Sequence, residues 1–136
     1  MGLAETAFRV FTQGHATFYR ATGGKLAGKR LLLLTTTGRK SGKQRVSPLM
    51  RIEDGDNYLV VGSAGGAHRH PGWYHNLRED PSVRVQVGST VENRTARIAE
   101  GEERDRLWQK FVDTDKRFAT YQTKTNRVIP VVVLEK

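Results

Sequence analysis

The segment with the densest chemistry is a short basic turn from Thr35 to Arg45, with the sequence TTTGRKSGKQR. It places four cations and several hydroxyl groups within eleven residues, and Gly38 and Gly42 frame it. Glycines allow backbone N–H groups to line a concave turn, and arginine offers paired donors that match phosphate oxygens. The pattern therefore predicts an anion site, although a solvated basic hairpin turn has the same composition.

This turn does not match a P-loop. Three residues separate Gly38 from Gly42, whereas the P-loop has four between its glycines. Gln44 stands where that motif needs Ser or Thr, and a strand rather than a helix is predicted to follow. An anion site here is therefore of a different kind.

Small residues form a second candidate segment, Val61 to Gly66, at the end of an apolar strand. Small side chains let a planar ligand lie close to backbone amides. A flexible loop explains the same composition, so this segment alone leaves both interpretations open.

A third candidate segment, from His68 to Leu77, contains three histidines as well as Trp73, Tyr74 and Asn76. A stacked ring and an amide would orient a bound heterocycle. Alternatively, Trp73 and Leu77 are four residues apart and anchor a short helix in the core. No Asp, Glu or Cys lies among the histidines, so no metal site is expected.

The composition is that of one soluble domain spanning residues 1–136, with 37% hydrophobic and 27% charged residues. The absence of cysteine excludes disulfides, thiolate metal sites and a cysteine nucleophile. No secretory signal and no membrane-spanning apolar run is found, so a cytoplasmic protein is expected. The net charge of +9 attracts anions, whether nucleic acid, an acidic membrane surface or a phosphorylated ligand.

The elements that would position these segments are mostly strands. The apolar and β-branched runs predict strands over 31–37, 44–52, 58–63, 82–87, 90–98 and 128–134. Helices are expected over 72–79, 102–112 and about 3–22, the last of which covers the core, closes over a ligand or lies on a membrane surface. About six strands with short hairpins favour a mostly β fold with flanking helices (α+β), in the form of a small barrel.

Three long runs, LLLTTTGRKSGKQRVSPL, GSAGGAHRHPGWYHNLREDPSVRVQV and YQTKTNRVIPVVVLE, resemble the deazaflavin-dependent nitroreductase family, whose members reduce quinones or nitro compounds. The resemblance covers roughly residues 30–136. It implies a split β-barrel similar to the FMN-binding fold. It also implies binding of coenzyme F420, a deazaflavin that carries a phosphodiester and a polyglutamate tail.

Carried over residue by residue, the resemblance assigns three groups of cofactor contacts. The phosphate and tail would meet Arg39, Lys40 and Ser41, in a groove also lined by Arg45, Val46, Ser47, Pro48, Leu49 and Met50. The ring would lie over Val61, Gly62, Ser63 and Ala64. The helix would complete the pocket with Gly72, Trp73, Tyr74, His75 and Asn76.

The implied activity is hydride transfer from reduced F420 to an electron-poor acceptor, a quinone or a nitroaromatic compound. Tyr121 and Ser63 are the candidates for proton delivery, with water as a third source. Some relatives carry Lys at the position of Ala64 and Tyr at that of Phe118, which makes reduction of bulky nitro compounds less expected here.

Other functional classes remain open at this point. An F420 carrier without turnover needs the same binding residues, and an FMN-binding or haem-binding split barrel shares the fold. A nucleic-acid-binding barrel explains the charge, but its aromatic residues should interleave with cations along strands, whereas here they cluster in helices. No nucleic-acid partner is therefore expected. The chain is expected to be a monomer or a homodimer, with membrane contact through the N-terminal helix as an alternative.

Overall fold

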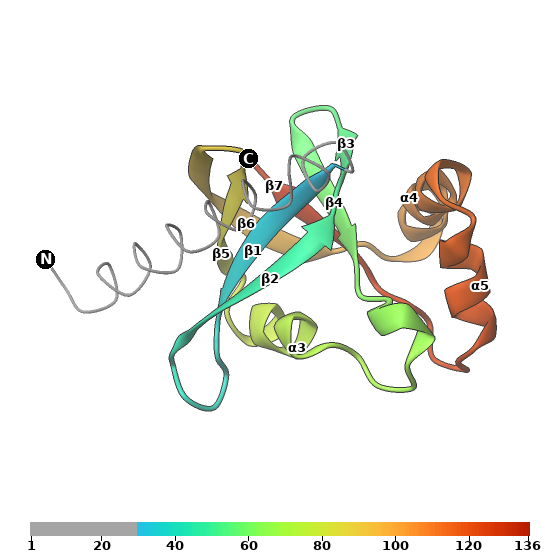
Figure 1. Ribbon diagram of the computed structural model, residues 1–136, viewed down its shortest axis with the longest axis horizontal. Coiled ribbons are helices and arrows are strands. Elements are labelled where there is room, and N and C mark those ends of the chain that lie inside the picture. Colours follow the sequence, from blue (N-terminus) through green and yellow to red (C-terminus); the bar gives the residue numbers. More distant parts are fainter. Residues whose placement is uncertain (1–29) are drawn as a thin grey trace, which may run out of the picture.

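The computed structural model describes residues 30–136, so the helix predicted over about 3–22 lies outside the described residues. Within them, an antiparallel seven-stranded sheet has the order β2-β1-β5-β6-β7-β4-β3 (Figure 1). The strands are β1 (Leu31–Thr37), β2 (Gln44–Met50), β3 (Ile52–Asp54), β4 (Asn57–Val61), β5 (Ser82–Val87), β6 (Thr90–Ile98) and β7 (Val131–Glu135). The helices are η1 (Ala64–Gly66), α3 (Gly72–Glu79), α4 (Gly101–Thr114) and α5 (Arg117–Thr123).

The two edge strands of the sheet, β2 and β3, follow one another in the chain with only Arg51 between them. The Arg51 N–H donates to the carbonyl of Arg30 at 2.7 Å, and its guanidinium donates to the carbonyl of Leu31 at 2.5 Å. The sheet curls into an open barrel, because the chain passes directly from one edge strand, β2, to the other, β3. The two edge strands do not pair with each other. This arrangement confirms the expected split barrel. The single strand predicted over 44–52 is wrong at its end, because the chain bends at Arg51.

Apolar side chains fill both faces of the sheet. On β4 and β7, Val60 and Val132 belong to one core cluster while Leu59 and Val133 belong to another, as alternation along strands requires. The first cluster is closed by Trp73, Tyr74 and Leu77 of α3, and the second by Leu107, Phe111 and Phe118 of α4 and α5. Figure 1 shows α3 on one side of the barrel and α4 with α5 on another.

Several sequence predictions are confirmed and a few are wrong at their boundaries. The strands over 31–37, 82–87 and 90–98 and the helix over 72–79 have the expected bounds. The last strand begins at Val131 rather than 128, because Val128 is 65% exposed and Pro130 has no N–H to donate to a neighbouring strand. Helix α5 was not predicted. Among residues 30–136, no helix is long and apolar enough to cross a membrane.

Candidate functional site

Backbone hydrogen bonds close the basic turn between β1 and β2. The Gly38 N–H donates to the carbonyl of Lys43 at 2.7 Å, and the Gly42 N–H donates to the carbonyl of Gly38 at 2.8 Å. A Cβ at Gly38 would lie 2.9 Å from Ser41 Oγ and 3.0 Å from the Lys43 carbonyl. Gly42 has a φ of +70°, in the left-handed region that favours glycine. The two glycines therefore hold the turn in one compact shape.

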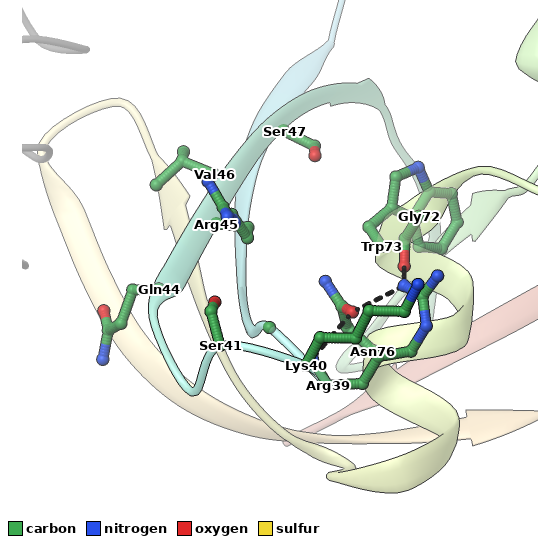
Figure 2. Close-up of a pocket in the computed structure, with 11 residues that line it drawn as sticks. Arg39, Lys40, Ser41, Gln44, Arg45, Val46, Ser47, Gly72, Trp73 and Asn76 are labelled. Carbon is green, nitrogen blue, oxygen red and sulfur yellow. Dashed lines mark hydrogen bonds between the residues drawn. The ribbon is translucent and has the colours of Figure 1, made fainter.

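Asn76 of α3 ties the helix to this turn (Figure 2). Its Oδ1 accepts from both the backbone N–H and the Nη1 of Arg39, each at 3.1 Å. Its Nδ2 donates to Thr36 Oγ1 at 3.2 Å, and the side chain is only 5% exposed. Both ends of the amide are therefore used within the protein. Asn76 therefore positions Arg39, and its predicted contact with a bound heterocycle stays a prediction.

A cavity of about 570 Å³ lies between the basic turn, β2 and the start of α3. Figure 2 shows its lining side chains, which come from these three elements. The predicted residues that line it are Arg39, Lys40, Ser41, Arg45, Val46, Ser47, Gly72, Trp73 and Asn76. Gly38 and Gln44 also line it and were not predicted, although they belong to the same turn. The cavity thus joins two of the three candidate segments.

The charges on this cavity are uncompensated. Lys40 and Arg45 are exposed and make no hydrogen bond or ion pair with residues 30–136. The ion pairs of the described residues lie elsewhere, for example Arg97 with Glu103 and Glu135. An oxyanion is the ligand that such a donor set fits, since Lys, Arg and a serine hydroxyl all donate.

Trp73 gives the cavity an apolar wall. The side chain is 7% exposed and belongs to the first core cluster, yet it also borders the cavity. The two interpretations of Trp73, core anchor and ligand wall, are therefore compatible. Tyr74 packs in the same core cluster, while His75 borders two neighbouring hollows next to Arg39.

The rest of the predicted groove does not line this cavity. Pro48 is exposed on the edge strand β2, where a residue without an N–H is tolerated. Leu49 and Met50 pack against the two core clusters. Their assignment as cofactor contacts stays a prediction.

The small residues after β4 have a packing role in this structure. A Cβ at Gly62 would lie 2.9 Å from Pro130 Cγ, and one at Gly66 would lie 2.9 Å from the carbonyl of Tyr121. Close approach of the 121–130 segment therefore requires glycine at both positions. Val61 is buried in the second core cluster and Ala64 is exposed in η1. Their predicted place beneath a ring is untested.

The two candidate proton donors lie away from the cavity at the turn. The ring of Tyr121 packs edge-on against Phe118, with ring centroids 5.8 Å apart. The backbone carbonyl of Ser63 accepts from Arg127 Nη2 at 2.9 Å. Neither residue borders the cavity, so their catalytic role stays a prediction.

Comparison with known proteins gives a consistent result. The family model described as F420H(2)-dependent quinone reductase matches residues 7–136. An F420H(2)-dependent quinone reductase of Mycobacterium tuberculosis (strain H37Rv) is 42% identical over 131 residues, which is 90% of this chain and 87% of that protein.

Two solved structures are also similar to the chain. One described as an F420-H2 dependent reductase (FDR-A) is 49% identical, with a TM-score of 0.72, over 79% of this chain and 95% of that one. Another, described as a domain-swapped dimer, is 49% identical, with a TM-score of 0.73, over 79% of this chain and 81% of that one.

Proposed function

The chain belongs to the F420H(2)-dependent quinone reductase family, and from this membership we propose that it reduces a quinone with coenzyme F420 held at the basic turn. The observation that carries the placement is the cavity of about 570 Å³ whose cations, Lys40 and Arg45, have no partner within residues 30–136. The phosphodiester of F420 is an anion that this donor set fits.

The chain's own residues contribute binding and orientation. Lys40 and Arg45 hold the phosphodiester, and Asn76 keeps Arg39 in place beside them. Trp73 offers a flat apolar wall at the same cavity, which suits the edge or face of a heterocycle and keeps water from it. When reduced F420 is bound, it supplies the hydride that the acceptor receives. Tyr121 and Ser63 are the residues we propose for proton delivery to the acceptor.

The acceptor and the assembly are further parts of the proposal. A quinone is the acceptor in the printed names of the relatives, whereas a nitroaromatic acceptor rests only on the resemblance of the sequence. One similar structure is a domain-swapped dimer, and this favours a homodimer over a monomer. Cytoplasmic placement, and contact of the segment 3–22 with a membrane, stay as predictions from the sequence.

The first experiment is a fluorescence titration of the purified protein with F420. We expect Lys40→Ala and Arg45→Ala to raise the Kd about tenfold or more each, since a hydrogen bond to a charged group contributes about 1.5–3 kcal/mol. Lys43→Ala is the matched control. This variant removes the same charge from the same turn, but Lys43 does not line the cavity. Equal effects of all three variants would contradict the placement.

A second experiment separates an enzyme from a carrier. Reduced F420 is mixed with a soluble quinone, and the absorbance of oxidised F420 is followed with and without the protein. Turnover that exceeds the uncatalysed rate supports the reductase. Stoichiometric F420 binding without turnover would favour the carrier, and a preference for FMN or a short DNA in parallel titrations would favour the other two alternatives.

A further inference from the structure

A second cavity of about 500 Å³ lies beside the first, at the start of α3. It shares Arg39 and Gly72 with the cavity at the turn. The other lining residues are His68, Arg69, His70, His75 and Arg127. The lining thus holds three arginines and three histidines and no carboxylate, so like the cavity at the turn it is lined by cations without acidic residues.

Arg127 is the key residue because its contacts are all with neutral groups. Its Nε donates to the Ala67 carbonyl at 2.9 Å and its Nη2 to the Ser63 carbonyl at 2.9 Å. Its Nη1 lies 3.0 Å from His70 Nδ1. A guanidinium has five N–H donors, so one N–H on each Nη remains without a partner in residues 30–136. Such a pair matches the two oxygens of a carboxylate or phosphate.

The position of Arg127 makes its charge costly without an anion. Burial lowers the pKa of the Arg127 guanidinium, and no carboxylate acts against that change. Burial also lowers the pKa of His70, and the positive charge of Arg127 adds to the effect. Arg127 is partly buried and has no carboxylate partner within residues 30–136, so an anionic ligand would supply the missing charge.

The three histidines do not make this a metal site. Arg127 donates to His70 Nδ1, and cationic arginines surround the imidazoles, so a metal cation would meet repulsion. Among residues 30–136, no group of three potential ligands is placed to hold a metal ion. The chemistry of the lining favours an anion.

We propose that this second cavity is a carboxylate-binding subsite, and that one multiply charged ligand occupies it together with the cavity at the turn. Arg39 stands between the two cavities and borders both, with its Nη1 held by Asn76. Carboxylates of a short oligoglutamate chain fit the subsite, because Arg127 and Arg69 present separate donors to successive acidic groups. The carboxylate subsite stands without the proposed function, but the identification of its occupant with the glutamate tail of F420 rests on it.

The test compares F420 with one glutamate and F420 with several glutamates, by fluorescence titration of the full chain. We expect the wild-type protein to bind the longer form about tenfold more tightly. Arg69→Ala should bring the ratio of the two Kd values close to one. Arg127→Lys keeps the charge but loses the paired donors, so it should lower this ratio partly. Lys116→Ala is the matched control, since it removes one exposed charge that borders neither cavity. A ratio that Arg69→Ala leaves unchanged would overturn the proposal.

A second arm separates this proposal from the proposed function. Free triglutamate and inorganic phosphate are titrated calorimetrically into the wild-type protein and into Arg69→Ala. Triglutamate binding that Arg69→Ala abolishes supports the subsite even if F420 does not bind, an outcome that would reject only the proposed function. Triglutamate binding without any effect of tail length would overturn the shared occupancy of the two cavities. Absence of both effects would overturn the subsite itself.

Discussion

At the scale of single residues, the site depends on the amide of Asn76, which borders the cavity and is hydrogen-bonded within the protein. Asn76 uses its oxygen for Arg39 and its nitrogen for Thr36, whose side chain is 1% exposed. A buried hydroxyl and a turn N–H are satisfied by one side chain, so the helix and the turn keep a fixed distance. The cation that borders both cavities is thus set in place by a neutral residue.

We therefore expect Asn76→Ala to affect both stability and binding. Loss of these contacts leaves polar groups unpaired and should lower the free energy of unfolding by about 1–3 kcal/mol. The freed Arg39 should raise the Kd for F420 several-fold. Urea denaturation and fluorescence titration measure the two effects. Asn57→Ala, which removes an exposed contact with the Lys136 N–H, is the control and should change neither value much.

At the scale of elements, the basic turn between β1 and β2 requires glycine at position 38. An added Cβ at Gly38 would meet the backbone carbonyl of Lys43, which cannot move without breaking the hydrogen bond that closes the turn. We expect Gly38→Ala to lower the free energy of unfolding by about 1–3 kcal/mol. Gly72→Ala is the control for stability, since nothing lies within 4 Å of an added Cβ there. A Gly38→Ala variant as stable as the wild type would contradict this account of the turn.

A second element-scale prediction concerns the β3–β4 hairpin, which an ion pair joins to α4. Lys110 Nζ lies 2.8 Å from Asp54 Oδ1, and this hydrogen bond, aided by Arg106, lowers the pKa of Asp54. A lowered folded pKa contributes stability above the unfolded pKa of about 3.9, and that stability is lost as the pH falls through the folded pKa.

Asp54→Asn should therefore cost about 0.5–1 kcal/mol at pH 7 and much less below about pH 3. Urea denaturation of both proteins at the two pH values gives the difference directly. Other carboxylates titrate in both proteins and cancel from it. A difference that stays constant with pH would show that the hairpin is held to α4 without this charge.

A feature of the fold could be predicted from the sequence where it depends on residues close together in the chain. The strand over 82–87 follows from alternation of valines and polar residues, and the anion turn is predicted from its own composition. The bend at Arg51 was missed because it arises from the curling of the whole sheet. Helix α5 was missed because its sequence, RFATYQT, has weak helix formers, and packing of Phe118 on Phe111 holds it instead.

The same distinction applies to the site. The contact of Asn76 with Thr36 joins residues forty positions apart, and that of Arg127 with Ser63 joins residues sixty-four apart. Nothing near Arg127 in the sequence marks it as a partner of the 63–70 loop. Such residues could be found only once the barrel had brought the segments together.

At the scale of the whole molecule, the charges are sorted into two regions. The acidic residues that form ion pairs meet Arg51 and cations of β6, α4 and α5, such as Arg97, Arg106 and Arg117. The cations around the two cavities take part in none of the ion pairs found within residues 30–136. Much of the net charge of +9 therefore acts at one place, where it attracts an anion.

This segregation predicts how binding responds to salt. The Kd for F420 should rise steadily between about 0.05 and 0.5 M NaCl, because the Debye length falls well below 10 Å over that range. Lys40→Ala should weaken the dependence on salt. Arg97→Ala lowers the net charge equally but removes a cation already paired with Glu103 and Glu135, so it should leave the dependence as in the wild type. If the Kd of the two variants depends equally on NaCl, the total charge of the protein attracts the cofactor, rather than the cations gathered at the two cavities.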